Sequence, residues 1–449
     1  MISTRKYYSD IGHKKQMNFL LKILLNITQS TALRKNTTLT FVMQILSALT
    51  QLLIIILIAW KLGPEGNGFY TMSILLPSIL VTFLNIGVGP ATVYYISNGT
   101  VSGRQAVREN LILAIQISAA GLLIGVAVIW FWSDSIFPGI PLALLLIGIL
   151  SFPIALVNSY IVTVLQGVQD FRAYNYSVVT APIVTLVMVF ITVYLMELGI
   201  NGAVVSYLAG QIAGLVAVCI FIRKVIFYSG NTEKDHITDY KRKVLGFGWK
   251  AHLSNIMAFV NYRADIFLVN IFINPVATGI YFIAVQVAEG LWLFSHAVST
   301  VLFPKLSSMH NDPVKRGGLT RHSAVIVGVT TIFSAILLTI FFFYILIPIL
   351  GEKYKEAFLP YLWLLPGVLA GAISRIYSNC IAAAGRPEWN LYTSILVVII
   401  NVIGNVVLIP VFGIEGAAIA TTIAYIINFL IRLYLVHRLP HDSPQVSFN

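Results

Sequence analysis

Apolar runs of roughly 20 residues recur along the chain from residue 38 to residue 437, separated by short polar breaks. A helix needs about 20 apolar residues to cross a hydrocarbon core about 30 Å thick, so each run is long enough to span a membrane. A closed β-barrel also satisfies the backbone in lipid, but its strands alternate over about ten residues. The unbroken apolar stretch from Leu52 to Trp60 excludes that alternation. The sequence therefore predicts an all-α, polytopic membrane protein.

About twelve spans fit the length of the chain, and its composition agrees with that number. Only 10% of the 449 residues are charged, whereas a soluble domain carries about a quarter charged residues. The expected spans lie near residues 38–60, 70–97, 109–132, 141–165, 174–196, 201–222, 249–273, 277–303, 323–349, 356–384, 390–410 and 414–436.

The positive charges predict how these spans are oriented. If the N-terminus is cytoplasmic, 24 of the 29 Lys and Arg residues fall on the cytoplasmic side. The opposite side keeps Lys61, Lys353 and Lys355, and Arg263 and Arg375 lie within spans. The positive-inside rule then places both termini in the cytoplasm. The net charge of +12 is read as an orientation signal and an attraction to anionic headgroups, so no nucleic-acid partner is expected.

Short motifs recur in order along the two halves of the chain. The pattern of Pro64 and Gly68 returns as Pro275 and Gly279, at an offset of 211 residues. A second match, at an offset of 214, relates residues 199–203 to residues 413–417. Ordered repeats indicate two six-helix halves, and because six is even, both halves start on the same side. Parallel halves of this kind are typical of transporters that bind their substrate between the halves, near mid-membrane.

The predicted organisation follows from these repeats. We expect a basic, interfacial amphipathic segment at 1–35, an N-lobe at 36–222, a cytoplasmic linker at 223–248, a C-lobe at 249–437 and a cytoplasmic tail at 438–449.

Four ionisable residues fall inside predicted spans, all in the second half: Arg263, Asp265, Glu289 and Arg375. Such groups cost at least about 2.5 kcal/mol each at the membrane centre, so they face a cavity or a partner. Arg263 and Asp265 are two residues apart and point in different directions on a helix, so each needs a partner on another helix. One interpretation is a structural ion network. The other, which we favour, is a site where the arginines hold an anion and a carboxylate exchanges a cation.

Polar residues also follow one face of the first span, at spacings of four, three and four residues: Thr40, Gln44, Ser47 and Gln51. Such a stripe either lines water or bonds to a neighbouring helix. Asn401 and Asn405, four residues apart in the eleventh span, carry the same two interpretations.

Several chemistries have no support in the sequence. No Gly-x-x-x-x-Gly-Lys loop is present, so ATP hydrolysis by this chain is not expected. His252, His296 and His322 have no second ligand at metal spacing, and neither a metal nor a cofactor is expected. The predicted outer loops are only a few residues long, which disfavours an integral-membrane glycosyltransferase or polymerase.

A set of local motifs resembles the polysaccharide flippases of the MOP superfamily, the Wzx type. The first is Leu62-Gly63-Pro64-Glu65-Gly66-Asn67-Gly68-Phe69-Tyr70, directly after the first span. The others lie at residues 263–265, 278–281, 302–307, 384–386, 408–410 and 413–417.

This resemblance implies twelve helices in two lobes around a central cavity. The implied cargo is a polyprenyl-diphosphate-linked oligosaccharide, moved from the inner to the outer leaflet of the cell inner (plasma) membrane for O-antigen, capsule or exopolysaccharide export. Membrane lipids and other polysaccharide-assembly proteins are the further expected partners. Related lipid II flippases place cations in the first lobe's cavity that have no counterpart here, so lipid II itself is not the expected cargo.

The implied cargo and the polar positions within the spans together predict the substrate-binding residues. A diphosphate requires cations, which Arg263 and Arg375 supply. Hydroxylated sugars require amides and hydroxyls, expected from Gln44, Ser47, Gln51, Asn401 and Asn405. Some members of the family couple transport to protons or sodium, for which Asp265 and Glu289 are the available carboxylates.

Three other functions compete with the flippase. A multidrug and toxin extrusion exporter of the same superfamily would carry organic cations and would favour acidic over basic cavity groups. A membrane glycosyltransferase or polymerase is disfavoured by the short loops, and a scramblase-like or purely interacting membrane protein by the ionisable groups inside the spans.

Overall fold

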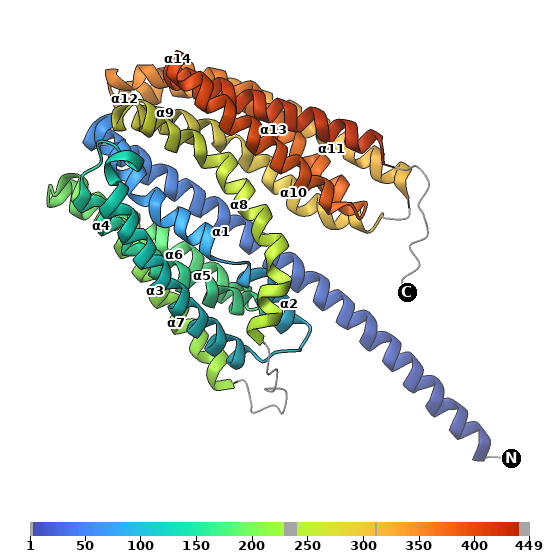
Figure 1. Ribbon diagram of the computed structural model, residues 1–449. Helices are drawn as coiled ribbons and strands as arrows, with labels where there is room; N and C mark the ends of the chain where they lie inside the picture. Colours follow the sequence, from blue (N-terminus) through green and yellow to red (C-terminus); the bar gives the residue numbers. More distant parts are fainter. Residues whose placement is uncertain (1–2, 229–239, 310–311, 440–449) are drawn as a thin grey trace.

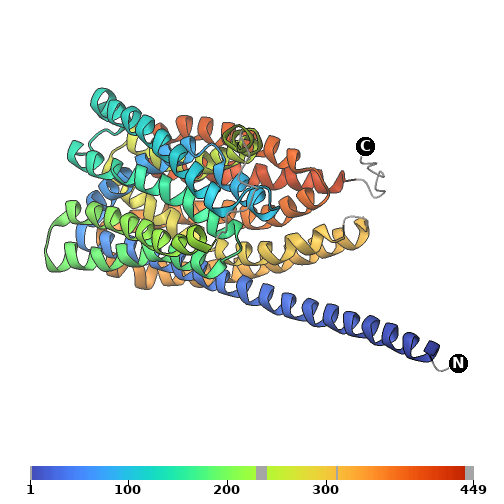
Figure 2. The same ribbon diagram turned by 90° about the horizontal axis from the view of Figure 1, so that it is seen from below.

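The computed structural model describes residues 3–228, 240–309 and 312–439 of the chain, and nearly all of these residues are helical. Figure 1 shows two groups of helices, one drawn in blue to green and the other in yellow to red. Both termini lie towards the same end of the molecule in Figures 1 and 2. We call this the termini end and the opposite one the far end.

The first half comprises α1 (Ser3–Leu84), α2 (Val88–Ser97), α3 (Gly103–Ile136), α4 (Leu142–Ile149), α5 (Ser151–Gly167), α6 (Phe171–Val189), η1 (Phe190–Leu195) and α7 (Gly199–Tyr228). The second half comprises α8 (Tyr240–Phe272), α9 (Pro275–Gly290), α10 (Trp292–Ser307), α11 (Pro313–Phe341), η2 (Phe342–Leu346), α12 (Ile347–Leu350), η3 (Glu352–Ala357), α13 (Phe358–Ala383) and α14 (Pro387–His437).

The helices account for the twelve predicted spans. Nine helical segments within the described residues are long and apolar enough to cross a membrane. Two of them contain a sharp turn at a left-handed glycine, Gly63 (φ 70°) in α1 and Gly413 (φ 60°) in α14, so each supplies two spans. Glycine tolerates this conformation because it has no Cβ. The more polar α8, with 33 residues, supplies the remaining span. The predicted fold class, twelve helices in two lobes, is confirmed.

Three predicted spans are interrupted helices. The span at 70–97 is the end of α1 followed by α2, with a break at residues 85–87. The spans at 141–165 and 277–303 are α4 with α5 and α9 with α10. Composition alone does not reveal these breaks, because the residues on either side are apolar.

The predicted segment boundaries differ from the helix boundaries at two places. The N-terminal segment 1–35 is continuous with the first span, because α1 begins at Ser3. Helices enter the predicted linker 223–248 from both sides, since α7 ends at Tyr228 and α8 begins at Tyr240. The centre of that linker and nearly all of the tail 438–449 lie outside the described residues.

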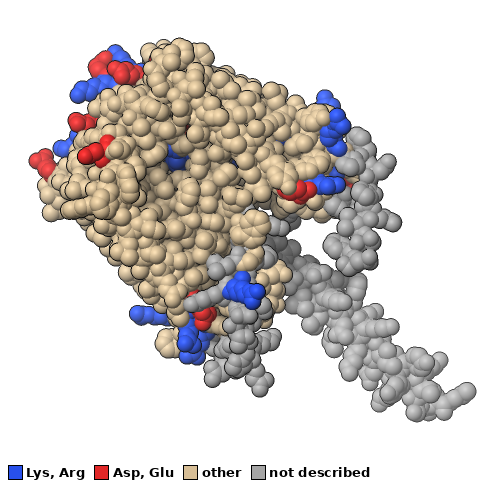
Figure 3. Space-filling model, in the orientation of Figure 1, with Lys and Arg blue, Asp and Glu red and all other residues tan. Residues whose placement is uncertain are grey.

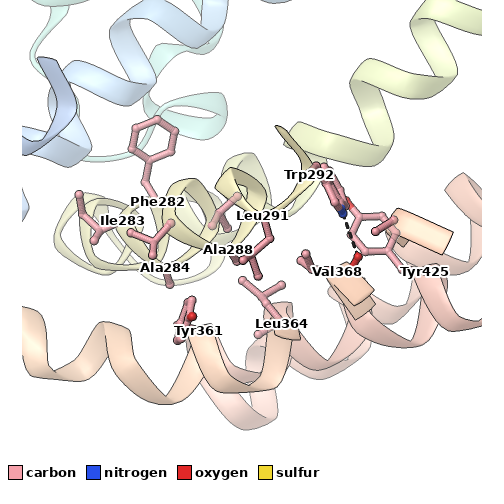
Figure 4. Packing of buried hydrophobic residues seen from close by; sticks show 14 of the residues in the cluster. Phe282, Ile283, Ala284, Ala288, Leu291, Trp292, Tyr361, Leu364, Val368 and Tyr425 are labelled. Atoms are coloured by element: carbon pink, nitrogen blue, oxygen red, sulfur yellow. Dashed lines mark hydrogen bonds between the residues drawn. The ribbon is translucent and has the colours of Figure 1, made fainter. Parts of the chain in front are cut away.

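Each lobe has its own buried core. In the C-lobe, Figure 4 shows Ala288 of α9 and Leu291, the residue after its end, directed towards Tyr361 and Leu364 of α13, whereas Phe282 points towards the other lobe. The lipid-facing surface is apolar as well. Figure 3 shows charged side chains at the two ends of the molecule and a broad uncharged face between them, in which Lys or Arg is visible only at the bottom of a hollow.

Candidate functional site

The two lobes meet at the far end through the segments that the sequence identifies as repeats. A Cβ added to Gly68 would lie 1.8 Å from the carbonyl oxygen of Pro275, and one added to Gly279 would lie 1.9 Å from that of Pro64. The contact is therefore reciprocal: the glycine of each repeat packs on the proline carbonyl of the other. Asn67 is fully buried here and donates from Nδ2 to the carbonyl of Gly279 at 3.0 Å. This packing closes the space between the lobes at the far end.

A cavity of about 330 Å³ lies between the lobes on the termini side of this contact. The N-lobe contributes residues of α1, α6 and α7, and the C-lobe contributes residues of α8 and α9. The polar and charged side chains that line it are Gln51, Tyr70, Thr71, Ser78, Thr185, Tyr207, Gln211, Arg263 and Gln286. Among these lining residues Arg263 alone carries a charge, so the cavity presents one cation within a ring of amides and hydroxyls.

Arg263 is held at the cavity wall by two contacts. Its Nη1 donates to the backbone carbonyl of Tyr262 at 3.0 Å and to Oε2 of Glu289 at 3.4 Å. The Arg263 side chain keeps 31% of its surface exposed, and that of Glu289 keeps 20%. Arg263 therefore has a partner on another helix, as its position in a predicted span required. At this length the ion pair leaves the other guanidinium nitrogens of Arg263 available to a ligand.

Asp265, two residues later, turns into the C-lobe core, where it is 2% exposed. Its Oδ2 accepts from the hydroxyl of Tyr281 at 2.7 Å and from that of Thr421 at 3.2 Å. Its Oδ1 accepts from the backbone N–H of Ile266 at 2.8 Å. Three neutral donors therefore hold one carboxylate inside the lobe.

Asn401 and Asn405 continue this network. Asn401 donates to Thr421 at 3.3 Å, and Asn405 donates to the Oδ1 of Asn401 at 3.2 Å. Both asparagines are fully buried and lie outside the lining of the interlobe cavity. The sequence analysis expected both asparagines at the substrate cavity, but in the structure they lie beside Asp265 instead. The four-residue spacing correctly put them on one helix face, but it does not reveal which neighbour that face meets.

In the polar stripe of the first span, one residue bonds to a neighbouring helix and the other three line cavities. Thr40 accepts a hydrogen bond from Asn175 of α6 at 2.8 Å, so it joins two helices. Gln44 and Ser47 line a pocket of about 180 Å³ between α1 and α6, and Gln51 borders both this pocket and the interlobe cavity. The stripe therefore leads along α1 towards that cavity.

Arg375 is not in the interlobe cavity. It lines a separate cavity of about 190 Å³ inside the C-lobe, and its Nη1 lies 3.2 Å from Nδ1 of His296. The sequence placed Arg263 and Arg375 in one site, but the helices of the C-lobe separate them.

Sequence reasoning missed several lining residues of the interlobe cavity. Gln211 of α7 and Gln286 of α9 are amides inside apolar runs. That position could have identified both as candidate cavity residues. Gln286 also lies three residues before Glu289 and therefore on the same helix face. Tyr207 lies four residues before Gln211 and gives no such signal, because tyrosine is common in membrane helices.

Comparison with known proteins gives a family match over more than half of the chain. Residues 33–310 match the model of the family described as polysaccharide biosynthesis protein. An uncharacterised membrane protein of Methanocaldococcus jannaschii, MJ1375, is 22% identical over 400 residues, which cover 85% of this chain and 92% of that protein. Agl15 of Haloferax volcanii, described as a probable low-salt glycan biosynthesis flippase, is 26% identical over 201 residues, covering 43% of this chain and 41% of that protein.

Solved structures with the same fold include two kinds of transporter. The lipid II flippase MurJ in an inward closed conformation superposes with a TM-score of 0.72 at 17% identity, covering 90% of this chain and 88% of that chain. A multidrug resistance transporter of the MATE family in an inward-facing conformation superposes with a TM-score of 0.67 at 14% identity, covering 87% of this chain and 94% of that chain. The chain therefore belongs to the polysaccharide biosynthesis protein family and has the two-lobe fold of MOP superfamily transporters.

Proposed function

We propose that this protein is a flippase that moves polyprenyl-diphosphate-linked oligosaccharides from the inner to the outer leaflet of the cell membrane, for export of a surface polysaccharide. The observation that carries this proposal is the interlobe cavity, in which one arginine is surrounded by amides and hydroxyls. The family match supports a role in polysaccharide assembly. The described functions of Agl15 and MurJ support movement of lipid-linked glycans.

In this proposal, different cavity residues contact different parts of the cargo. Arg263 contacts the diphosphate, because a guanidinium offers several donors to phosphate oxygens. Gln51, Gln211 and Gln286 contact sugar hydroxyls, because an amide both donates and accepts hydrogen bonds. Among the described residues that line this cavity, none from the N-lobe is charged. This supports a lipid-linked sugar other than lipid II, which was also the expectation from the sequence.

Alternating access follows from the closed far end. With both termini in the cytoplasm, as the Lys and Arg distribution predicts, the Gly68 and Gly279 contact seals the cavity from the outside. Transport then requires the lobes to separate there and to close at the termini end. The fold accommodates such a change: multidrug resistance transporters that share it are known in inward-facing and outward-facing conformations.

We also propose that a carboxylate of the C-lobe carries the coupling ion, a proton or sodium. Asp265 is the stronger of the two candidates, because it is buried among neutral donors, whereas Glu289 pairs with Arg263. A charge enclosed in this way is expensive without a cation or a proton. Because Asp265 and Arg263 are both on α8, the state of one affects the helix that positions the other.

A cation-coupled multidrug exporter is the alternative function, supported by the fold shared with MATE transporters. The lining of the cavity argues against it. Arg263 supplies a positive charge where an organic cation would bind, and like charges at close range repel.

The test is genetic complementation with a lipid-intermediate readout. Cells in which the gene for this protein is deleted receive a gene for the wild type, for Arg263→Gln or for the control variant Arg438→Gln. The control changes an exposed arginine that stacks on Tyr434. We expect cells with Arg263→Gln to lack surface glycan and to accumulate the lipid-linked precursor in the inner leaflet. The variant protein should be present at the wild-type level. Arg438→Gln should behave as the wild type. Normal glycan with Arg263→Gln, or drug sensitivity in place of glycan loss, contradicts the proposal.

A further inference from the structure

The cavity inside the C-lobe has a composition of its own. It lies among α8, α10, α13 and α14, and has a volume of about 190 Å³, well above the roughly 10–15 Å³ that one water molecule requires. Its polar side chains come from Asn261, Arg375, Asn428, Arg432 and two serines. The helix α8 separates it from the interlobe cavity: Tyr262 lines this cavity, and the next residue, Arg263, lines the other.

Two arginines share this cavity without a carboxylate. Among the described residues, neither Arg375 nor Arg432 has an Asp or Glu within 4.0 Å, in contrast to Arg263 with Glu289. The Nη1 of Arg375 meets His296 at 3.2 Å, and the Nη1 of Arg432 donates to the hydroxyl of Ser374 at 3.3 Å. Neutral partners leave both positive charges uncompensated inside the lobe. Buried charges are normally paired, so this cavity calls for an anion.

Unused hydrogen-bonding groups mark the same place. The Nε of Arg375 and the Nε of Arg432 are buried and have no hydrogen-bond partner. The amide oxygens of Asn261 and Asn428 are buried without a partner as well. Because the two ends of an amide are assigned from hydrogen bonding, each asparagine can present either its oxygen or its NH₂ group to a ligand. Donors on two sides of one cavity match an anion with several oxygens.

The remaining wall is aromatic. Trp292 lies 5.4 Å from Tyr262 and 5.4 Å from Tyr425, measured between ring centroids. Figure 4 shows Trp292 beside Tyr425, with its indole N–H donating to the carbonyl of Val368, a bond of 2.9 Å. The hydrogen bond holds the indole of Trp292 in place, and the three rings leave the arginines and asparagines as the polar face of the cavity.

We infer that this cavity is a second anion site, which binds phosphate groups, diphosphate included, between Arg375 and Arg432. Guanidinium groups bind phosphate oxygens through paired N–H donors, which lysine does not offer. Arg432 lies five residues before the end of α14, about 8 Å along the helix axis from the termini end. The site therefore lies towards the side from which the proposed cargo enters, yet its residues are independent of the interlobe cavity and of the proposed function.

Anion binding is measured on the purified full-length protein in detergent, by calorimetric titration with sodium pyrophosphate and, separately, inorganic phosphate at constant ionic strength. Sodium chloride and sodium sulfate report charge screening and non-specific binding. We expect saturable pyrophosphate binding by the wild type, weakened at least tenfold in Arg375→Gln and in Arg432→Gln. The exposed Arg438→Gln is the matched control and should retain wild-type affinity. Arg263→Gln is titrated alongside it, to distinguish binding between the lobes from binding inside the C-lobe.

The outcomes separate the alternatives. Loss of binding in Arg263→Gln with retention in Arg375→Gln and Arg432→Gln places the anion between the lobes and overturns the inference, as does a wild type that binds no phosphate compound. If a glutamine variant does not elute as a monodisperse protein, Arg432→Lys decides. It keeps the charge but loses the paired donors, so an affinity below the wild type supports the inference and an unchanged affinity contradicts it.

A competition experiment identifies the source of the phosphate group. Pyrophosphate titrations are repeated with micelles that contain phosphatidylglycerol or a polyprenyl diphosphate. If phosphatidylglycerol competes with pyrophosphate in the wild type and this competition is lost in Arg432→Gln, the site binds lipid headgroups. If only the polyprenyl diphosphate competes, the site binds the cargo. Surface glycan measured in the same variants is a separate readout, so a failure of the flippase proposal does not affect the binding result.

Discussion

The reciprocal contact at the far end predicts that a single methyl group changes which end of the transporter is open. Gly68→Ala adds a Cβ 1.8 Å from the carbonyl oxygen of Pro275, where ordinary contact begins at 3.4 Å. The two lobes must therefore separate by about 1.6 Å at this point or distort locally. Gly279→Ala does the same against Pro64, at 1.9 Å.

The magnitude follows from the cost of overpacking. Added methyl groups in well-packed contacts cost about 1–3 kcal/mol. The cost arises only in the state that is closed at the far end, so the ratio of closed to open molecules should fall by about 5- to 150-fold. Alanine is also the better helix former, by about 0.5–1 kcal/mol, but that gain is present in both states and cancels.

The assay is a distance measurement between the lobes. Spin labels are placed at Glu197 and Lys353, two exposed positions at the far end, one in each half. The exposed native Cys219 is first replaced by serine so that it does not label, whereas Cys380 is buried. We expect Gly68→Ala and Gly279→Ala to shift the distance distribution towards longer separations. Gly317→Ala, on an exposed helix position with open space around it, is the control and should match the wild type.

The double variant sharpens the test. Once one clash has opened the far end, the other is already relieved, so Gly68→Ala with Gly279→Ala should shift the equilibrium by less than the sum of the two single changes. Unchanged distances in both single variants, or an equal shift in Gly317→Ala, would refute the reasoning.

Two further predictions use the same assays. Asn67→Ala removes the 3.0 Å hydrogen bond to Gly279 and should shift the equilibrium towards the open far end by about 0.5–1.5 kcal/mol. An unchanged distance distribution in the same spin-label experiment, or one shifted to shorter separations, would contradict this. Asp265→Asn keeps the side-chain size but removes the charge held by Tyr281 and Thr421. Transport into proteoliposomes should then lose its dependence on a proton or sodium gradient, and an undiminished gradient dependence would exclude Asp265 as the coupling residue.

The sequence predicts the fold more fully than the site because the two depend on different information. Spans follow from apolar runs, and the turns at Gly63 and Gly413 follow from repeated glycine motifs, all of which are local. The pairing of Arg263 with Glu289 was also accessible, because both lie on consecutive spans and carry opposite charge. No local pattern reveals that Gly68 meets Pro275, since this contact depends on how the finished lobes dock.

The residues of the C-lobe cavity show the same limit. Arg375 was grouped with Arg263 because both are cations in spans, but the rotation of α13 about its axis directs Arg375 into its own lobe. Arg432 was counted with the cytoplasmic charges because it lies near the end of the last apolar run. Five residues of helix are enough to bring its side chain back into the lobe, where Asn428, one turn earlier, lines the same cavity.

The helix α8 connects these sites physically, because it is bonded to both lobes. Near its start, the hydroxyl of Tyr240 donates to Oδ1 of Asn110 in the N-lobe at 3.0 Å. Near its end, Asp265 is held by Thr421 in the C-lobe. Any change in the angle between the lobes must therefore tilt or bend α8 between these two attachments, and Arg263 lies within that stretch. A ligand that binds Arg263 more tightly in one arrangement than in the other shifts the equilibrium towards that arrangement, and the shift can be no larger than the difference in binding free energy. In the proposed mechanism, α8 thus couples cargo binding to opening of the far end.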